Sequence, residues 1–434
     1  MKKLKERLIR YALIVMIGLS FFLSWKIWTQ SGNKSLQNMN TSATPSAVKE
    51  AKDIFVPVQL VYHESPDNAA LSNRSGLIDR MNRLLFQLKL GRVTAHRDLS
   101  DDRYFALQQV APSVELIFSD AISLEYYLDI NEEKLKGDAI DNVTVNRLVF
   151  DPEASVLYFM DDRNKTIYEA SASGLNEETY QDLLSEGRNH FKKVTMDGTL
   201  TPHLYLYDEP VTLKKYSYIL ETQSYTMFSN ALFKNTEDVF ANDAQKDDKN
   251  INLMNAEGQK LNIQYETGEV RFNDRYSPAN PNALEMANTS YQAIKRIANN
   301  MGIVRYFANQ NGTIVYRNFV EGYPIFSDQN KGRIEVSFFE GQLSIVTNQD
   351  TILVPIPADE TVTLPQTSDV LNELLMAGVK KEDIQGLQIG YTWHTNRETR
   401  QVVDLEPEWY VNYRGVWDNV PTVLHLLATE REEM

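Results

Sequence analysis

Residues 284–302 read LEMANTSYQAIKRIANNMG, and the spacing of apolar side chains in this stretch decides the fold class. Apolar residues recur every three or four positions, the period of one helix face, at Leu284, Ala287, Tyr291, Ile294, Ile297 and Met301. The helix is expected to end near Gly302. Strand-like segments follow it and alternate with hairpin turns at Asn311-Gly312, Lys331-Gly332 and Glu340-Gly341. A helix followed by hairpins predicts an antiparallel sheet with a helix packed on one face.

The same plan recurs further along the chain. A helix is predicted over Asp369–Met376, and strands are predicted over Leu387–His394, Arg400–Leu405 and Trp409–Tyr413. Two successive helix-then-hairpin units indicate an α+β protein in which the sheets are mainly antiparallel.

The residues before position 284 also mix helices and strands. Helices are predicted from Leu77 to Leu88, over Glu177–Phe191 and over Tyr225–Phe233. Strands are predicted at Asp53–Tyr62, Val114–Phe118, Ser123–Ile130, Val143–Phe150, Val156–Met160, His203–Tyr207, Tyr216–Leu220, Leu261–Tyr265 and Glu269–Phe272. We expect three domains after the N-terminal region: an α/β domain at residues 53–190, a β-rich domain at 191–279 and an α+β domain at 280–434.

The N-terminal region predicts a single membrane-spanning helix. Tyr11–Trp25 is an uncharged run, YALIVMIGLSFFLSW, and Arg10 and Lys26 at its ends can extend toward the lipid headgroups. Residues 8–28 are therefore long enough to span a bilayer. Basic residues before the run place residues 1–7 in the cytoplasm and the rest of the chain outside. A cleaved signal peptide is the alternative, but no small-residue cleavage pattern follows Trp25.

The charge is divided unevenly between the N-terminal region and the body. The 434 residues include 44 Lys and Arg and 59 Asp and Glu; nine of the basic and two of the acidic residues lie within residues 1–52. The remainder carries 35 basic and 57 acidic residues, which makes it a poor partner for nucleic acid. Residues 29–52 are polar and are expected to form a flexible linker.

Motifs that carry catalysis are absent from the sequence. There is no cysteine, which excludes disulfides, zinc–thiolate sites and thiol catalysis. There is no Gly-rich phosphate loop or nucleophile elbow, and the six histidines are scattered. The acidic pairs Asp161-Asp162 and Asp247-Asp248 are interpreted as solvated turns rather than metal sites. We therefore expect no catalytic residue, no metal and no cofactor.

Aromatic residues gather in two clusters, Tyr205/Tyr207/Tyr216/Tyr218 and Trp409/Tyr410/Tyr413/Trp417. Such clusters can recognise proteins or stack on sugars. They can also simply fill strand faces, which is the favoured interpretation.

Several segments together resemble the YycH (WalH) family, which regulates the YycG (WalK) sensor histidine kinase of Firmicutes. They occur in the family's order: SWKIWT at 24–29, DIFVPVQL at 53–60, the stretch 216–233, ETGEVRF at 266–272 and LEPEWYV at 405–411. One departure is Val56, where a bulkier or basic residue is expected.

The resemblance implies a protein without enzymatic activity, anchored in the cell membrane with its body outside. It implies a C-terminal domain similar to YycI, and a complex with YycI and the kinase in which transmembrane helices make contact. Small residues allow close helix packing in lipid, so Gly18, Ser20 and Ser24 are the candidate contact residues. The alternatives are a cell-envelope enzyme or wall-binding protein that uses an aromatic groove, and an anchored inhibitor or chaperone-like module.

Overall fold

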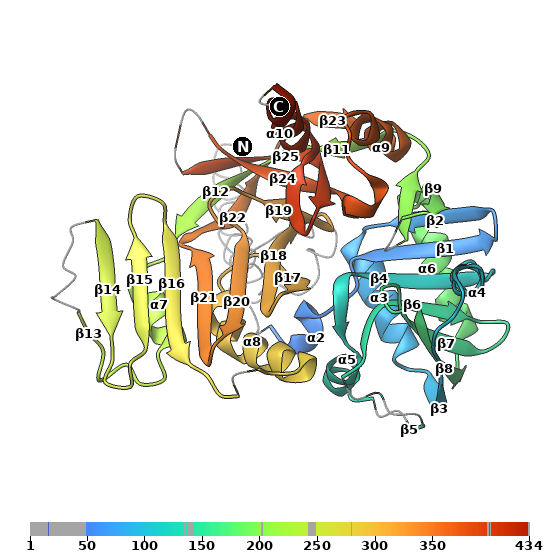
Figure 1. Cartoon of the computed structure of the whole chain (residues 1–434), viewed down its shortest axis with the longest axis horizontal. Helices are drawn as coiled ribbons and strands as arrows, with labels where there is room; N and C mark the ends of the chain where they lie inside the picture. The colour runs from blue at the N-terminus through green and yellow to red at the C-terminus, as the bar shows by residue number, and fades with distance from the viewer. Residues whose placement is uncertain are drawn as a thin grey trace, which may run out of the picture. The chain divides into compact units, whose positions relative to one another are not determined.

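The structure is a computed structural model that describes residues 16, 49–133, 136–137, 140, 142–200, 203–241, 249–278, 280–396, 399 and 401–432 (Figure 1). From residue 49 onward these residues belong to one compact unit. The predicted tail at residues 1–7 and the contact residues Gly18, Ser20 and Ser24 lie outside the described residues, as does the predicted span at 8–28 except for the helical Met16. Within the described part of the chain, no helix is long and apolar enough to cross a membrane.

The first sheet contains ten strands in the order β10-β9-β2-β1-β4-β6-β7-β8-β3-β5. Its strands are β1 (Gln59–Ser65), β2 (Asn68–Ser72), β3 (Lys89–His96), β4 (Ser113–Ser123), β5 (Lys136–Gly137), β6 (Thr144–Asp151), β7 (Val156–Asp161), β8 (Thr166–Ser173), β9 (Lys192–Asp197) and β10 (Leu204–Tyr207). All of its pairs are antiparallel except β3 with β5.

The second sheet contains fourteen strands, of which twelve follow the order β13-β14-β15-β16-β21-β20-β18-β19-β24-β25-β12-β22. In addition, β17 pairs with β18 and β26 pairs with β25. The strands are β12 (Tyr216–Thr222), β13 (Phe240–Ala241), β14 (Asn250–Met254), β15 (Lys260–Gln264), β16 (Glu269–Arg275), β17 (Ile303–Gln310), β18 (Thr313–Val320), β19 (Tyr323–Phe326), β20 (Arg333–Phe339), β21 (Gln342–Asn348), β22 (Asp350–Ile356), β24 (Ile384–Thr395), β25 (Val402–Tyr413) and β26 (Val416–Asn419). A separate two-stranded sheet pairs β11 (Val211–Lys214) with β23 (Thr361–Leu364).

Helices pack against these sheets and confirm the mixed α+β class with mainly antiparallel strands. They are α2 (Ala51–Ile54), α3 (Ser75–Leu85), α4 (Asp101–Gln108), α5 (Leu124–Ile130), α6 (Glu177–Gly187), α7 (Tyr225–Leu232), α8 (Ala283–Ala298), α9 (Thr367–Met376) and α10 (Val420–Glu432), with short 3₁₀ turns at Arg188–His190 and Lys381–Asp383. The predicted stripe of residues 284–301 forms α8, which begins with a capping box between Asn282 and Glu285. Its buried face packs on β18 and β20.

The prediction of a strand over Ser123–Ile130 is wrong. Residues 124–130 form helix α5, and the Ser123 side chain caps it by accepting a hydrogen bond from the Tyr126 backbone amide. Four of its residues (Leu124, Tyr126, Tyr127 and Leu128) are buried. Tertiary packing of this dense apolar cluster outweighs the β-propensity of its tyrosines.

The flexible linker that was predicted up to residue 52 is ordered from Lys49. Residues 51–54 form α2, with a capping box between Glu50 and Asp53, so the strand predicted from Asp53 begins only at Gln59. Phe55 is fully buried, and its ring lies 5.0 Å from Tyr126 of α5 and 5.2 Å from Tyr306 of β17. This short segment is therefore part of the core.

The strands predicted at Arg400–Leu405 and Trp409–Tyr413 form one continuous strand, β25. Pro407 lies in its middle and pairs with Tyr391 of β24 on one side. On the other side, pairing with β12 stops at Leu405 and pairing with β26 starts at Tyr410. Pro407 has no amide N–H to donate. No strand among the described residues pairs with Pro407 on that side, so the sheet loses no hydrogen bond there.

The predicted domain boundaries after residues 190 and 279 remain predictions. β9 and β10 follow the first boundary in sequence and pair within the first sheet. β14–β16 precede the second boundary and pair within the same sheet as β17–β21.

Candidate functional site

A group of charged side chains is buried on one face of the first sheet, around Arg147 of β6. The Arg147 guanidinium is paired with two carboxylates. Nη1 lies 2.5 Å from Oε1 of Glu115 on β4, and Nε lies 2.7 Å from Oδ2 of Asp162, just after β7. Nη2 donates to the backbone carbonyl of His203. Each edge of the guanidinium is therefore used.

The two carboxylates have further donors. Asp162 accepts hydrogen bonds from the Tyr104 hydroxyl at 2.8 Å and from Gln108 Nε2 at 2.9 Å, both on α4. Glu115 accepts a hydrogen bond from the Tyr205 hydroxyl, and its Oε2 lies 3.2 Å from His63 Nε2. The network thereby joins β1, β4, β6, β10 and α4.

The electrostatics of the network favour the charged forms. Burial opposes ionisation of Glu115, but Arg147, His63 and Tyr205 outweigh it and lower the pKa of Glu115 to about 2. Burial would also lower the pKa of Arg147, yet Asp162 and Glu115 raise it well above its usual value. Glu115 is 0% exposed and Arg147 is 2% exposed, so no substrate reaches them in this structure. The network fits a structural ion cluster better than an active site.

The interpretation of Asp161-Asp162 as a solvated turn is wrong. Both side chains are buried, and Asp161 accepts hydrogen bonds from the backbone amides of Arg163 and Asn164. The partners of Asp162 come from distant segments, which is why the pair looked like an ordinary turn in the sequence. No group of three or more His, Asp or Glu residues in the described residues is arranged to hold a metal ion. Asp247-Asp248 lies outside them.

The two aromatic clusters fill strand faces. Five of their members are buried (Tyr205, Tyr207, Tyr218, Trp409 and Tyr410), and Tyr216, Tyr413 and Trp417 are half-buried. Most pack within apolar clusters of the two large sheets. The rings therefore form no open stacking platform of the kind that the wall-binding alternative requires.

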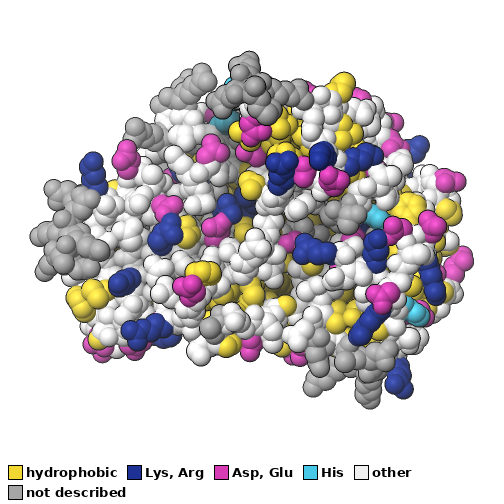
Figure 2. Space-filling view, in the orientation of Figure 1, with side chains coloured by type: hydrophobic (Ala, Val, Ile, Leu, Met, Phe, Trp, Pro, Cys, Tyr) yellow, Lys and Arg dark blue, Asp and Glu magenta, His cyan; other side chains and the backbone are white. Residues whose placement is uncertain are grey.

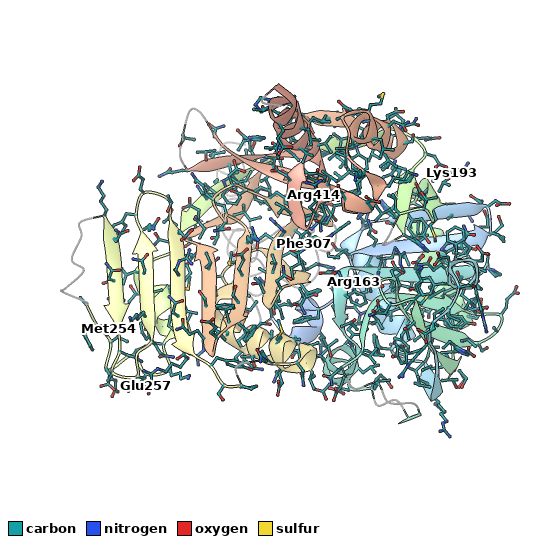
Figure 3. All side chains as sticks on the ribbon, viewed as in Figure 1. Arg163, Lys193, Met254, Glu257, Phe307 and Arg414 are labelled. Carbon is teal, nitrogen blue, oxygen red and sulfur yellow. The ribbon has the colours of Figure 1, made fainter. Side chains whose placement is uncertain are left out.

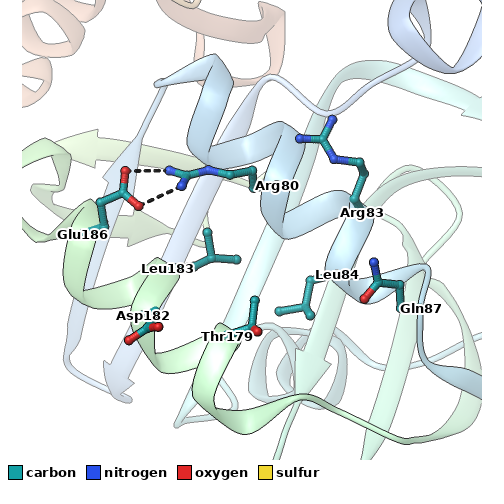
Figure 4. Close-up of a pocket in the computed structure, with 8 residues that line it drawn as sticks. All are labelled: Arg80, Arg83, Leu84, Gln87, Thr179, Asp182, Leu183 and Glu186. Atoms are coloured by element: carbon teal, nitrogen blue, oxygen red, sulfur yellow. Dashed lines mark hydrogen bonds and ion pairs between the residues drawn. The ribbon is translucent and has the colours of Figure 1, made fainter. Parts of the chain in front are cut away.

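A shallow groove of about 370 Å³ runs between α3 and α6 (Figure 4). Its floor contains Leu84 and Leu183. Across the groove, Arg80 donates to both carboxylate oxygens of Glu186 at 2.7 and 2.9 Å, as the dashed lines in Figure 4 show. The groove is lined by both basic and acidic side chains. They are not arranged as a general acid and a general base that point at one position.

A second polar feature lies where the described body begins. The Lys49 ammonium donates to the carbonyl oxygens of Ala298, Met301 and Gly302 at the C-terminal end of α8. The Lys49 backbone N–H donates to Asn299 Oδ1 at 2.8 Å, and its carbonyl accepts from the Tyr291 hydroxyl at 2.9 Å. Cations are favoured at helix C-termini, where carbonyl groups lack intrahelical partners. We call this set of contacts the Lys49 joint.

The chain matches two family models that between them cover most of its length. The YycH protein N-terminal domain matches residues 9–186, and the YycH protein C-terminal domain matches residues 201–429. The chain belongs to the YycH family. The crystal structure of YycH from Bacillus subtilis is similar to this fold, with a TM-score of 0.70 and 13% sequence identity over 86% of this chain and 98% of that chain. Among curated proteins there is no significant match.

Membership of the YycH family suggests a regulator of the YycG sensor kinase, as the resemblance of the sequence predicted. The charged network, the aromatic clusters and the Lys49 joint are contacts within the body, and none of them forms an open catalytic centre among the described residues.

Proposed function

We propose that this YycH-family chain is a non-enzymatic, membrane-anchored regulator of the YycG (WalK) sensor kinase that acts in a complex with YycI. The N-terminal helix at residues 8–28 crosses the cell membrane, and the body lies outside. The observation that carries the proposal is the family match, which begins at residue 9 and continues to residue 429 with a gap of 14 residues between the two domain models.

The Lys49 joint fixes the point at which the linker is attached to the body. Here the linker ends in α2, whose neighbour Phe55 packs between α5 and β17, while Lys49 is bound to the end of α8. A partner that shifts the second sheet relative to α5 therefore also shifts the residue to which the linker is attached.

Site-specific photo-cross-linking in intact membranes tests the proposal. A cross-linking amino acid is placed at Ser20 or Ser24, which share one face of a helix, and at Leu19 as the matched control, because Leu19 lies at least about 100° around the helix from Gly18, Ser20 and Ser24. We expect adducts with YycG or YycI from Ser20 and Ser24, and weaker adducts from Leu19. If neither YycG nor YycI is cross-linked from any of these three positions or from Gly18, the transmembrane part of the proposal is contradicted.

A further inference from the structure

Three neighbouring strands of the second sheet place arginines side by side. Arg305 of β17 pairs in register with Arg317 of β18, and Arg317 pairs with Arg333 of β20. Residues directly opposite each other on paired strands project from the same face of the sheet. The three side chains therefore form a row, which we call the arginine row. Like charges at such spacing repel one another unless anions lie nearby.

The two outer arginines have carboxylate partners. Arg305 Nη2 lies 3.3 Å from both carboxylate oxygens of Asp79, and its Nη1 donates to the Pro57 carbonyl at 3.1 Å. Arg333 is paired with Glu335, two residues along the same strand. The outer positions of the row are thus electrically balanced.

Arg317 in the middle has no carboxylate partner among the described residues. Its one hydrogen bond to them runs from Nη1 to the Ile325 carbonyl at 2.8 Å. The residue is only 5% exposed, and its Nε is buried without a hydrogen-bond partner. The Nε atoms of Arg305 and Arg333 are also buried without a hydrogen-bond partner. The row therefore combines one uncompensated charge with three unused N–H donors.

The unused edge of Arg317 has the geometry of an anion receptor. A guanidinium binds carboxylate or phosphate with two parallel N–H donors, and Nε with Nη2 forms one such fork. Because Nη1 of Arg317 donates to Ile325, the Nε side is the one on which a donor has no hydrogen-bond partner among the described residues.

Aromatic rings hold the Arg317 guanidinium in place. Its central carbon lies 4.8 Å from the ring centre of Phe307, which Figure 3 labels on β17, and 4.1 Å from that of Phe326. Phe326 in turn stacks on Tyr410 with ring centres 3.8 Å apart. These walls exclude water, so an anion beside Arg317 would be bound more strongly than on an open surface. Burial, together with the nearby Arg333, lowers the pKa of Arg317 to about 9, which is consistent with a missing counter-ion.

We propose that the arginine row is a binding site for one oxyanion group, a carboxylate or a phosphate, which pairs with the Nε side of Arg317. Arg333 is the more exposed end of the row, since its side chain is 29% exposed while Arg317 is nearly covered. The site does not depend on the proposed regulation of a kinase, and it would make the body responsive to a small anionic ligand.

Thermal unfolding of the purified full-length chain in detergent is the primary measurement. Inorganic phosphate and succinate are compared with sodium chloride at equal ionic strength. A ligand that binds only the folded state raises the midpoint, and the rise grows with the logarithm of one plus its concentration divided by its dissociation constant. A rise with phosphate alone identifies a phosphate site, and a rise with succinate alone identifies a carboxylate site. No rise with either overturns the proposal.

Three variants locate the site. Arg317→Met is expected to weaken binding roughly 10- to 100-fold, as loss of a hydrogen bond to a charged group would. Arg333→Met, at the more exposed position, is expected to weaken it less and preserves the test if Arg317→Met fails to fold. Arg271→Met is the matched control, because Arg271 lies on β16 in the same cross-strand row as Glu335 and is 49% exposed. It should bind as the wild type does.

The Nε–H resonances in a ¹H–¹⁵N spectrum of the arginine side chains give an independent readout. Phosphate or succinate should shift the resonance that disappears in Arg317→Met and leave the Arg271 resonance unchanged. An equal midpoint rise in wild type and in Arg333→Met, without a shift of the Arg317 resonance, would mean that the anion binds elsewhere and would refute the site.

Discussion

Arg147 and Arg317 occupy similar positions in the two large sheets, but their interaction partners differ. Each lies on an internal strand, and each is almost fully buried at 2% and 5% exposure. Arg147 has two carboxylates and a carbonyl, whereas Arg317 has one carbonyl and two aromatic rings. The pKa of Arg147 is raised and that of Arg317 is lowered. Removal of a buried charge that has internal partners leaves those partners unpaired, whereas a buried charge without such partners is suited to a ligand.

Removal of the Arg147 side chain should have the largest effect on stability. Arg147→Met leaves Glu115 and Asp162 buried without their cation, and breaking such a pair costs about 3–5 kcal/mol. Urea unfolding of the full-length chain measures the loss. Arg163→Met is the control, because Arg163 is 76% exposed and should change stability by less than about 0.5 kcal/mol. Equal stabilities of the two variants would show that the network is not structural.

Acid should weaken the Arg147 network in a defined pH range. The pKa of Glu115 is about 2 in the folded chain and 4.5 ordinarily, so the unfolded chain binds more protons between these values. Stability should therefore fall as pH falls from about 4.5 to about 2, by up to about 3 kcal/mol from this group. Glu115→Gln should lower stability at neutral pH and remove that part of the pH dependence. Parallel curves for variant and wild type would contradict the assignment.

The Lys49 joint should contribute less than the buried network. Lys49→Met removes charge-assisted hydrogen bonds to the end of α8, for an expected loss of about 1–2 kcal/mol. Hydrogen exchange should become faster at the C-terminal end of α8. Lys52→Met is the control, since Lys52 is half exposed and, among the described residues, forms an ion pair only with Glu50. Unchanged exchange in Lys49→Met would mean that the joint does not hold the linker.

The smallest effect is expected at Arg317. Arg317→Met replaces an unpaired buried cation with an apolar side chain, so stability without added anion should change by no more than about 1 kcal/mol and can increase. Side-by-side unfolding of Arg147→Met and Arg317→Met tests the contrast directly. If Arg317→Met lost as much stability as Arg147→Met, the aromatic contacts of Arg317 would stabilise the fold as strongly as the charged network around Arg147 does.

The fold class followed from local patterns, because helices such as α8 and hairpin turns leave a signal within about ten residues. Errors arose where tertiary contacts decide. Residues 124–130 were predicted as a strand and form α5, and the ordered segment from Lys49 depends on contacts about 250 residues away.

The charged sites were not predictable from the sequence. Arg147 lies 15 residues from Asp162 and 32 from Glu115, and only the strand order brings them together. Arg305, Arg317 and Arg333 look like unrelated surface arginines until the register of β17, β18 and β20 aligns them. The contact candidates Gly18, Ser20 and Ser24 remain predictions.

The regulatory role is tested most directly by the output of a gene that YycG controls, measured in cells that lack this chain. We predict that the output changes on deletion, that the full-length chain restores it, and that a chain without residues 1–28 does not. Unchanged output on deletion would contradict the proposed function itself. Full restoration by the truncated chain would contradict the role assigned to the membrane helix.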